Sequence, residues 1–134
     1  MIDGPGGPVA VGIDVVDVAR IRTALDRTPS LADRTFTEAE LAYCRAARDP
    51  AERFAARWAA KEAVVKCLGG GVPGIDLRCI EVVRGDDGAP HLRLSGEAAA
   101  RADQRGIASW LVSLSHTSTV AQAIALALGP GRSD

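Results

Sequence analysis

The chain has 134 residues, which suits a single domain built around one hydrophobic core. Its 16 basic and 17 acidic residues nearly cancel, so bulk charge predicts binding neither to nucleic acid nor to an anionic membrane. The three cysteines form no CxxC pair, and the sequence has neither a signal-peptide pattern nor a long apolar run, so we expect no disulfide framework, no zinc site and a cytoplasmic protein.

The start of the chain predicts a strand followed by a helix. Residues 1–8 are rich in Gly and Pro and should form a flexible tail. Residues 9–16, VAVGIDVV, are dense in β-branched side chains and predict a strand, with Asp14 near its end. A helix should follow over residues 17–27, where apolar residues recur at helical spacing.

Two further helices are predicted in the middle of the chain. Thr37 and Glu40 have the spacing of a capping box, which marks the start of the first. Pro50 opens the second, the longest in the chain, which should end at the glycines of 69–71.

The second half of the chain predicts mostly strands, arranged as two hairpins around a short helix. This order indicates an α+β fold, in which a largely antiparallel sheet packs with a long central helix and shorter helices. One domain should span residues 9–128, with a second flexible tail at 129–134. The expected strands cover 78–84, 90–94, 108–115 and 119–128, and the short helix covers 95–104.

Lys61 occupies an unexpected position on the long helix. A helical wheel places it inside the sector that should face the core, where a charge costs several kcal/mol unless it is paired or reaches a polar cleft. Arg53 and Arg57 precede it at spacing four, and like charges so placed repel one another, which predicts an anionic partner or ligand. The apolar residues of that sector are Phe54, Trp58, Val65 and Leu68.

Asp14 and Glu62 are candidates for a metal site. Asp17 can cap the helix that follows the first strand, which leaves Asp14 available. Two carboxylates without a neighbouring His or Cys cluster suit a hard cation such as Mg²⁺, or Mn²⁺ in its place, with water and phosphate oxygens completing the shell. Basic side chains nearby would hold the remaining phosphate charge, so these residues predict a diphosphate substrate.

A plainer interpretation of the long helix is also open. Arg53 and Arg57 would then be solvated, and Glu62 and Lys66 would form an ordinary i,i+4 salt bridge. That interpretation explains neither Lys61 nor an aspartate in an apolar strand.

Four segments, VGIDVVDVARI, FTEAELAYC, RFAARWAAKEAVVKCLG and SLSHT, resemble in order the motifs of holo-acyl-carrier-protein synthases, the short class of 4'-phosphopantetheinyl transferases. The most specific element is the pair formed by GID and, about fifty residues later, WAAKEAxxK. The resemblance implies the fold of that family and an enzyme that moves the phosphopantetheine arm of coenzyme A to a serine of an apo acyl carrier protein, releasing 3',5'-ADP.

The resemblance also implies roles for individual residues. Asp14 and Glu62 would hold Mg²⁺ against the diphosphate and act in catalysis together with Lys61. Glu62, or a metal-bound water that it orients, would accept the serine proton, and both alternatives stay open. His116 would contact a phosphate, although its position alone equally suits an exposed loop histidine. The coenzyme A residues implied in this way are Arg57, Lys61, Lys66, His116 and Thr117.

The resemblance further implies a docking surface for the acidic carrier protein at Arg20, Arg27 and Arg34, which by themselves would be read as solvated surface. It also implies a homotrimer with the active site between neighbouring subunits. Whether the carrier belongs to fatty-acid, polyketide or peptide synthesis stays open, as does the use of acyl-coenzyme A. The alternative functions are a metal-dependent hydrolase of coenzyme A or nucleotides, and a noncatalytic carrier-binding domain.

Overall fold

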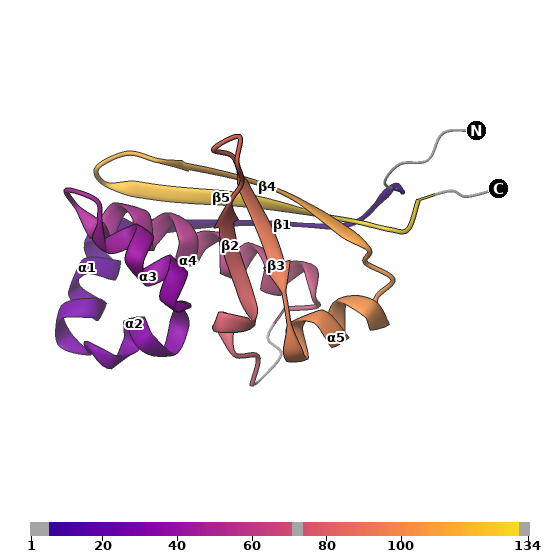
Figure 1. The fold of residues 1–134 in the computed structure, drawn as a ribbon, viewed down its shortest axis with the longest axis horizontal. Helices are drawn as coiled ribbons and strands as arrows, with labels where there is room; N and C mark the ends of the chain where they lie inside the picture. The colour runs from indigo at the N-terminus through magenta and orange to yellow at the C-terminus, as the bar shows by residue number, and fades with distance from the viewer. Residues whose placement is uncertain (1–5, 71–73, 132–134) are drawn as a thin grey trace.

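A computed structural model describes residues 6–70 and 74–131 of the chain. A long helix lies against a three-stranded sheet, the short helices of residues 18–45 cluster at one end, the short helix of residues 96–104 lies toward the other, and a hairpin crosses beside the long helix (Figure 1). In chain order the elements are β1 (Pro8–Asp17), α1 (Val18–Arg27), α2 (Ser30–Thr35), α3 (Glu38–Arg45), α4 (Pro50–Cys67), the 3-10 turn η1 (Leu77–Cys79), β2 (Ile80–Arg84), β3 (Pro90–Leu94), α5 (Gly96–Gln104), β4 (Ser109–His116) and β5 (Val120–Leu128).

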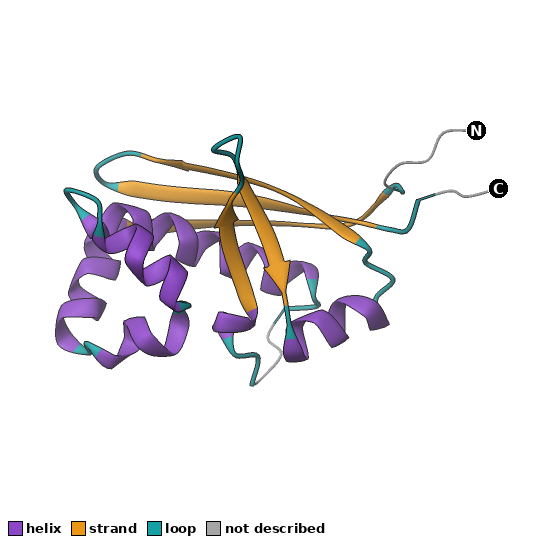
Figure 2. Cartoon of the chain, in the orientation of Figure 1, coloured by secondary structure: helices purple, strands orange, loops and turns teal. Residues whose placement is uncertain are grey.

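The main sheet has the strand order β1-β5-β4, and both pairs are antiparallel (Figure 2). Because side chains alternate along a strand, the sheet has two different faces. Gly12 and Asp14 of β1 belong to the inner face, and in the register Asp14 lies opposite Ala123 of β5. The strands β2 and β3 form a separate antiparallel hairpin, so the predicted α+β fold with antiparallel pairing is confirmed.

Helix α4 covers the inner face of the main sheet and is buried on almost every side. The predicted core sector is therefore wrong in part, because Trp58 and Val65 are only half-buried whereas alanines on other faces are inaccessible. The helix has no solvent face of the usual kind, since β1 and β5 cover one side and α1, α3 and β2 cover others. The buried alanines are Ala51, Ala55, Ala56, Ala59, Ala60 and Ala63.

The capping box that was predicted is present, since the Thr37 side chain accepts from the Glu40 backbone N–H and the Glu40 carboxylate accepts from the Thr37 N–H. Helix α2 was not predicted, because its six residues have no side-chain cap and no apolar period long enough to read. It packs through Ala32 and the adjoining Phe36 into the core formed by α1, α3 and the start of α4.

The domain extends beyond its predicted boundary. Pro8 belongs to β1, and Gly6 and Gly7 exchange backbone hydrogen bonds with Gly129. Residues 1–5 and 132–134 of the two predicted tails lie outside the described residues. Within the described residues, no helix has the length and apolar character needed to cross a membrane.

The outer face of the main sheet is apolar and exposed. Val11 and Val15 expose 61% and 60% of their surface, an unusual level for β-branched side chains in a strand. Exposed large apolar residues on this face are Val9, Val11, Ile13, Val15, Leu111 and Ile124. A contiguous patch of this kind typically marks an interaction surface.

Candidate active site

Asp14 reaches α4 because Gly12 lets the helix lie directly on β1. A Cβ atom at residue 12 would overlap the carbonyl oxygen of Ala63, so only glycine permits this approach. Asp14, two residues further along the same face, then meets Lys66, whose Nζ lies 3.3 Å from Asp14 Oδ1 and donates to the Ile13 carbonyl at 2.6 Å. The plainer interpretation assigned Lys66 to Glu62 alone, whereas here its hydrogen bonds go to β1.

Glu62 faces the same place from α4. Partial burial raises the pKa of Glu62, the negative charge of Asp14 raises it further, and Lys66 lowers it. The charges of Asp14 and Glu62 thus repel each other and Lys66 offsets part of that repulsion, an arrangement that a divalent cation would stabilise.

The donor set fits a hard cation that takes few protein ligands. In the part of the chain that the structure describes, no group of three or more His, Cys, Asp or Glu side chains gathers in a way that could hold a metal by itself. Mg²⁺ commonly uses one or two carboxylates and completes its shell with water and phosphate oxygens. Asp14 and Glu62 therefore fit Mg²⁺ when a phosphate-bearing substrate is present.

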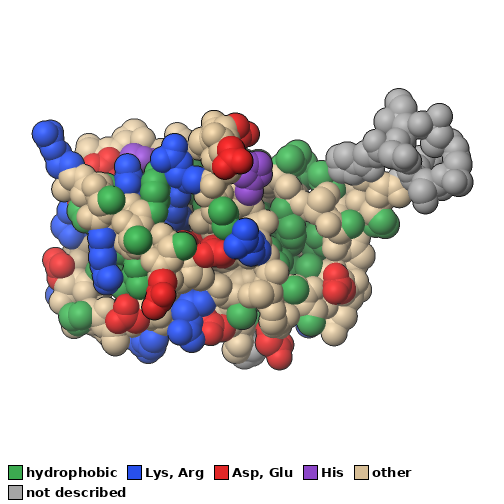
Figure 3. Space-filling view, viewed as in Figure 1, with side chains coloured by type: hydrophobic (Ala, Val, Ile, Leu, Met, Phe, Trp, Pro, Cys, Tyr) green, Lys and Arg blue, Asp and Glu red, His purple; other side chains and the backbone are tan. Residues whose placement is uncertain are grey.

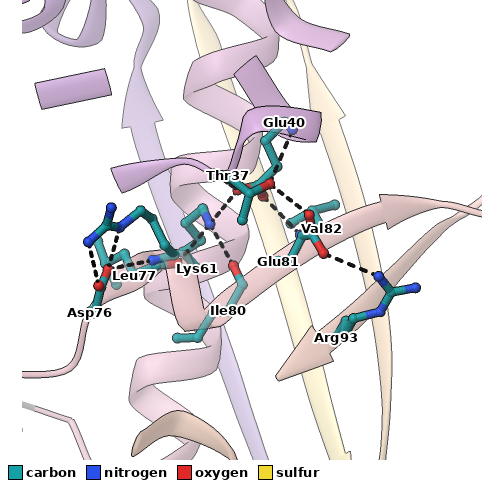
Figure 4. A network of polar contacts seen from close by, with 10 residues as sticks. Thr37, Glu40, Lys61, Asp76, Leu77, Ile80, Glu81, Val82 and Arg93 are labelled. Atoms are coloured by element: carbon teal, nitrogen blue, oxygen red, sulfur yellow. Dashed lines mark hydrogen bonds and ion pairs between the residues drawn. The ribbon is translucent and has the colours of Figure 1, made fainter. Parts of the chain in front are cut away.

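Lys61 does not join this group, which corrects its predicted role. Its side chain is inaccessible, and Nζ donates to Glu40 Oε1 at 2.8 Å, to the Leu77 carbonyl at 2.8 Å and to the Ile80 carbonyl at 2.6 Å (Figure 4). An ammonium group has three N–H donors, so none is left for a phosphate. Burial lowers the pKa of Lys61, and the Glu40 carboxylate opposes that shift. The charge of Lys61 on the core-facing side of α4 is therefore explained by its ion pair with Glu40 and not by a polar cleft.

Arg57 lies in a second, cationic pocket. Its side chain is buried, its guanidinium carbon stands 4.0 Å from the centre of the Tyr43 ring, and its Nε has no hydrogen-bond partner. Arg53 and Arg84 approach the same ring at 4.1 Å and 5.3 Å. The attraction of Arg53 and Arg57 to the Tyr43 ring offsets part of the repulsion predicted from their spacing of four residues, and a bound anion would offset it further.

His116 forms one wall of this pocket, which has a volume of about 210 Å³ and includes Arg53, Arg57 and Arg84. The Nδ1 atom of His116 lies 3.2 Å from Glu52 Oε1, so a carboxylate orients the ring. Thr117 follows in the turn between β4 and β5, where its hydroxyl accepts from the Thr119 and Val120 N–H groups. The pocket can bind an anion, whereas Thr117 is held mainly by its own turn.

The arginines predicted for docking lie on exposed helical surface. Arg20 and Arg27 are seven residues apart on α1 and therefore share a helix face, and Arg34 lies on α2. In the view of Figure 3, Lys and Arg side chains are most numerous on the left half of the molecule, where α1 to α4 lie in Figure 1. Beside α1, an apolar pocket of about 340 Å³ is flanked by the two-pronged ion pair between Arg22 and Asp49, at 2.7 and 2.9 Å.

Sequence reasoning missed several residues of these sites. Gly12 stood in the GID motif, but nothing local to the sequence indicated that α4 approaches there. Tyr43 and Arg84 lie on α3 and at the end of β2, and only the fold brings them to Arg57. Glu40 was predicted only as part of a capping box. The signal for its second role was Lys61, since a lysine on the core-facing side of a helix requires a buried carboxylate as partner.

Comparisons with known proteins identify the family of the chain. The model of the 4'-phosphopantetheinyl transferase superfamily matches residues 10–125. A holo-[acyl-carrier-protein] synthase from Streptomyces avermitilis is 49% identical over 123 residues, covering 90% of this chain and 98% of the relative.

Solved structures are similar as well. The chain superimposes on the holo-ACP synthase from Plasmodium yoelii with a TM-score of 0.81 and 28% identity, over 92% of this chain and 96% of the other. It matches the Helicobacter pylori holo-[acyl-carrier-protein] synthase in complex with coenzyme A with a TM-score of 0.75 and 28% identity, over 88% and 99%.

This chain therefore belongs to the 4'-phosphopantetheinyl transferase superfamily, among its holo-[acyl-carrier-protein] synthases. The predicted family, fold and activity are confirmed: the enzyme transfers the phosphopantetheine arm of coenzyme A to apo acyl carrier protein. The hydrolase and the noncatalytic domain are not favoured.

Proposed function

We propose that Asp14 and Glu62 hold Mg²⁺ for the transfer and that Lys66 binds the diphosphate of coenzyme A. The observation that carries this proposal is the ion pair of Asp14 on β1 with Lys66 on α4, beside the close contact of Gly12 with Ala63. Glu62 lies one turn before Lys66 on α4 and interacts electrostatically with both residues. When bound, the metal neutralises charge on the phosphate oxygens and so lowers the barrier to phosphoryl transfer.

Lys66 and Glu62 would have separate roles in the transfer step. The carrier serine hydroxyl attacks the phosphate that bears the pantetheine arm, the bond from that phosphate to the departing 3',5'-ADP breaks, and Lys66 stabilises the charge that develops. Glu62 is the candidate to accept the serine proton, directly or through a water that it orients. Its carboxylate would thus serve both metal binding and proton transfer.

The cationic pocket around Tyr43 would hold a phosphate of the nucleotide. Its support is the buried Nε of Arg57, which lacks a partner, together with Arg53, Arg84 and His116 around one cavity. Guanidinium groups suit phosphate because they donate in a planar fork. Thr117 would contribute at the edge of the nucleotide through the turn that follows His116.

The decisive assay combines the enzyme, coenzyme A, Mg²⁺ and an apo carrier protein, and measures intact mass. We expect the carrier to gain the phosphopantetheine mass and 3',5'-ADP to appear in equal amount. A panel of fatty-acid, polyketide and peptide carriers assigns the biosynthetic pathway, and acetyl-coenzyme A in parallel tests acyl forms. Loss of coenzyme A without mass gain on any carrier would instead identify a hydrolase.

The carrier would dock through the positive surface of Arg20, Arg27 and Arg34. These residues are exposed on α1 and α2, and the carriers of this family are acidic, so opposite charges would speed encounter. We expect Arg20→Glu to raise the KM for the carrier at least about tenfold while leaving the KM for coenzyme A unchanged. Equal effects on both substrates would contradict a docking role.

The outer face of the main sheet would form the core of a cytoplasmic homotrimer. Its exposed Val11, Ile13 and Val15 lie on the strand that carries Asp14, so the partner subunit would stand beside the active site. Light scattering should give three times the chain mass of 13.9 kDa. Ile13→Asp should yield monomers with little activity, and Ala100→Asp on exposed α5 serves as control. A monomeric wild-type enzyme would refute the trimer.

A further inference from the structure

The buried ion pair between Lys61 and Glu40 ties together parts of the molecule that are far apart in the sequence. Glu40 Oε1 accepts from Lys61 Nζ and, at 2.9 Å, from the Thr37 N–H, while Oε2 accepts from the Val82 N–H at 2.9 Å. Lys61 adds its bonds to the carbonyls of Leu77 and Ile80. The middle of α4 is thereby joined to α3, η1 and β2 by directional bonds (Figure 4).

The side of α4 that faces the sheet is held by close packing at Gly12 and by the bonds of Lys66 and Cys67 in the last turn of the helix. The helix presents Ala59, Ala60 and Ala63 to the sheet, and β5 presents alanines in return. Small side chains interlock less than large ones, so the directional bonds of Lys61 in the middle of the helix add to what fixes its rotation. The matching alanines of β5 are Ala121, Ala123, Ala125 and Ala127.

A rotation of α4 would disturb the metal site directly. Glu62 follows Lys61 in the sequence, and Lys66 lies little more than one turn further on, so both move with the backbone that Lys61 anchors. Net stability does not account for such a pair, because a buried ion pair is often no more stabilising than apolar residues of the same volume.

We propose that Glu40 and Lys61 are positioning residues that set the rotation of α4, so that Glu62 and Lys66 face Asp14. This inference rests on the proposed roles of Asp14, Glu62 and Lys66. Neither Glu40 nor Lys61 contacts the substrate. Their effect on the reaction passes through the backbone of α4.

The test compares the variant Lys61→Met with the double variant Glu40→Gln/Lys61→Met. The single variant leaves a carboxylate buried without its partner, whereas the double variant removes both charges and so recovers stability. We expect the double variant to fold, to bind Mn²⁺ in the presence of coenzyme A at least about tenfold more weakly, and to lose on the order of 100-fold in kcat. Electron paramagnetic resonance measures the Mn²⁺ binding without turnover.

A matched control separates positioning from general destabilisation. Leu41→Ala removes a buried apolar side chain from α3 beside Glu40 and should lower the melting temperature while keeping kcat and Mn²⁺ binding near wild type. A double variant that recovers wild-type kcat and Mn²⁺ binding together with stability would overturn the proposal. If it does not fold, Lys61→Arg, which keeps the charge on a longer group, must lower kcat at an unchanged melting temperature. Failure of both variants to fold would make the pair a stability element and refute positioning.

A crystal structure of the double variant distinguishes this proposal from the proposed function. If the wild-type enzyme binds no Mn²⁺ with coenzyme A, the metal site is wrong, but the structures still decide whether the pair positions α4. We expect the Glu62 carboxylate to move away from Asp14 in the double variant. An unchanged geometry would refute the inference.

Discussion

The two lysines of this chain, Lys61 and Lys66, lie five residues apart on α4, and each pairs with a carboxylate. In the first pair both side chains are 0% exposed and the Nζ to oxygen distance is 2.8 Å. In the second, Lys66 is 52% exposed, Asp14 is 20% exposed and the distance is 3.3 Å. The first pair is closed to solvent and saturated with hydrogen bonds. The second pair is open, and a further carboxylate, that of Glu62, interacts electrostatically with both of its members.

A single helix can therefore carry a structural and a functional lysine within two turns. Rotation about the helix axis separates them, since five residues at about 100° each bring Lys66 to a different side from Lys61. One side meets α3 and β2, which close over it, and the other meets the end of β1, which leaves the site accessible. Three substitutions and a pH dependence test this comparison.

The largest effect should come from breaking the closed pair. Lys61→Met leaves Glu40 buried without its counter-charge, so the free energy of unfolding should fall by about 3–5 kcal/mol. Urea denaturation measures this change. A loss below 1 kcal/mol, typical of exposed ion pairs, would show that Glu40 reaches solvent.

Removing the second acid of the open site should affect activity instead. Glu62→Gln keeps the shape but loses the charge that binds the metal, so kcat/KM should fall at least about 100-fold, or roughly 2.7 kcal/mol of transition-state stabilisation. Its melting temperature should not decrease, because neutral Gln removes a partly buried charge beside Asp14. Asp103→Asn on exposed α5 is the control, and full activity of Glu62→Gln would remove Glu62 from the site.

Lys66→Met should have a smaller effect on activity and almost none on stability. Its ion pair is exposed, so the free energy of unfolding should change by less than about 1 kcal/mol. Loss of one cation from the diphosphate should lower kcat/KM by about tenfold or more, which corresponds to about 1.4 kcal/mol. Urea denaturation and steady-state kinetics of both lysine variants measure these changes. Equal losses of stability in Lys61→Met and Lys66→Met would contradict our assignment.

The smallest effect is a pH dependence of stability in metal-free buffer. The pKa of Glu62 in the folded state lies above its ordinary value of 4.5, so between these two values the folded protein binds more protons than the unfolded chain. The free energy of unfolding contributed by Glu62 therefore falls as pH rises through this window. The stability of Glu62→Gln relative to wild type should be near zero below the window and favour the variant above it.

Added Mg²⁺ with coenzyme A provides the matching check on this pH effect. It should raise the melting temperature of the wild-type enzyme above that window more than that of Glu62→Gln. An equal rise in both proteins would mean that Glu62 does not bind the metal.

Most elements could be predicted because their signals are local. The capping box of Thr37 and Glu40, the helix start at Pro50 and the polar turns between strands depend on neighbours in the chain. Helix α2 was missed because its stability comes from packing of Ala32 and Phe36, not from its own sequence. The core sector of α4 was misjudged because a central helix is buried on almost every side and has no single apolar stripe to find.

The α+β order, the family motifs and the candidates Asp14 and Glu62 could be predicted because each depends on residue type and spacing. The fold then set which charges meet. It paired Lys61 with Glu40, gathered arginines on Tyr43 and brought Lys66 to Asp14 across the contact at Gly12. The physical reason is that a charge on a helix takes its role from what covers that side of the helix, and this depends on strands and helices distant in the sequence.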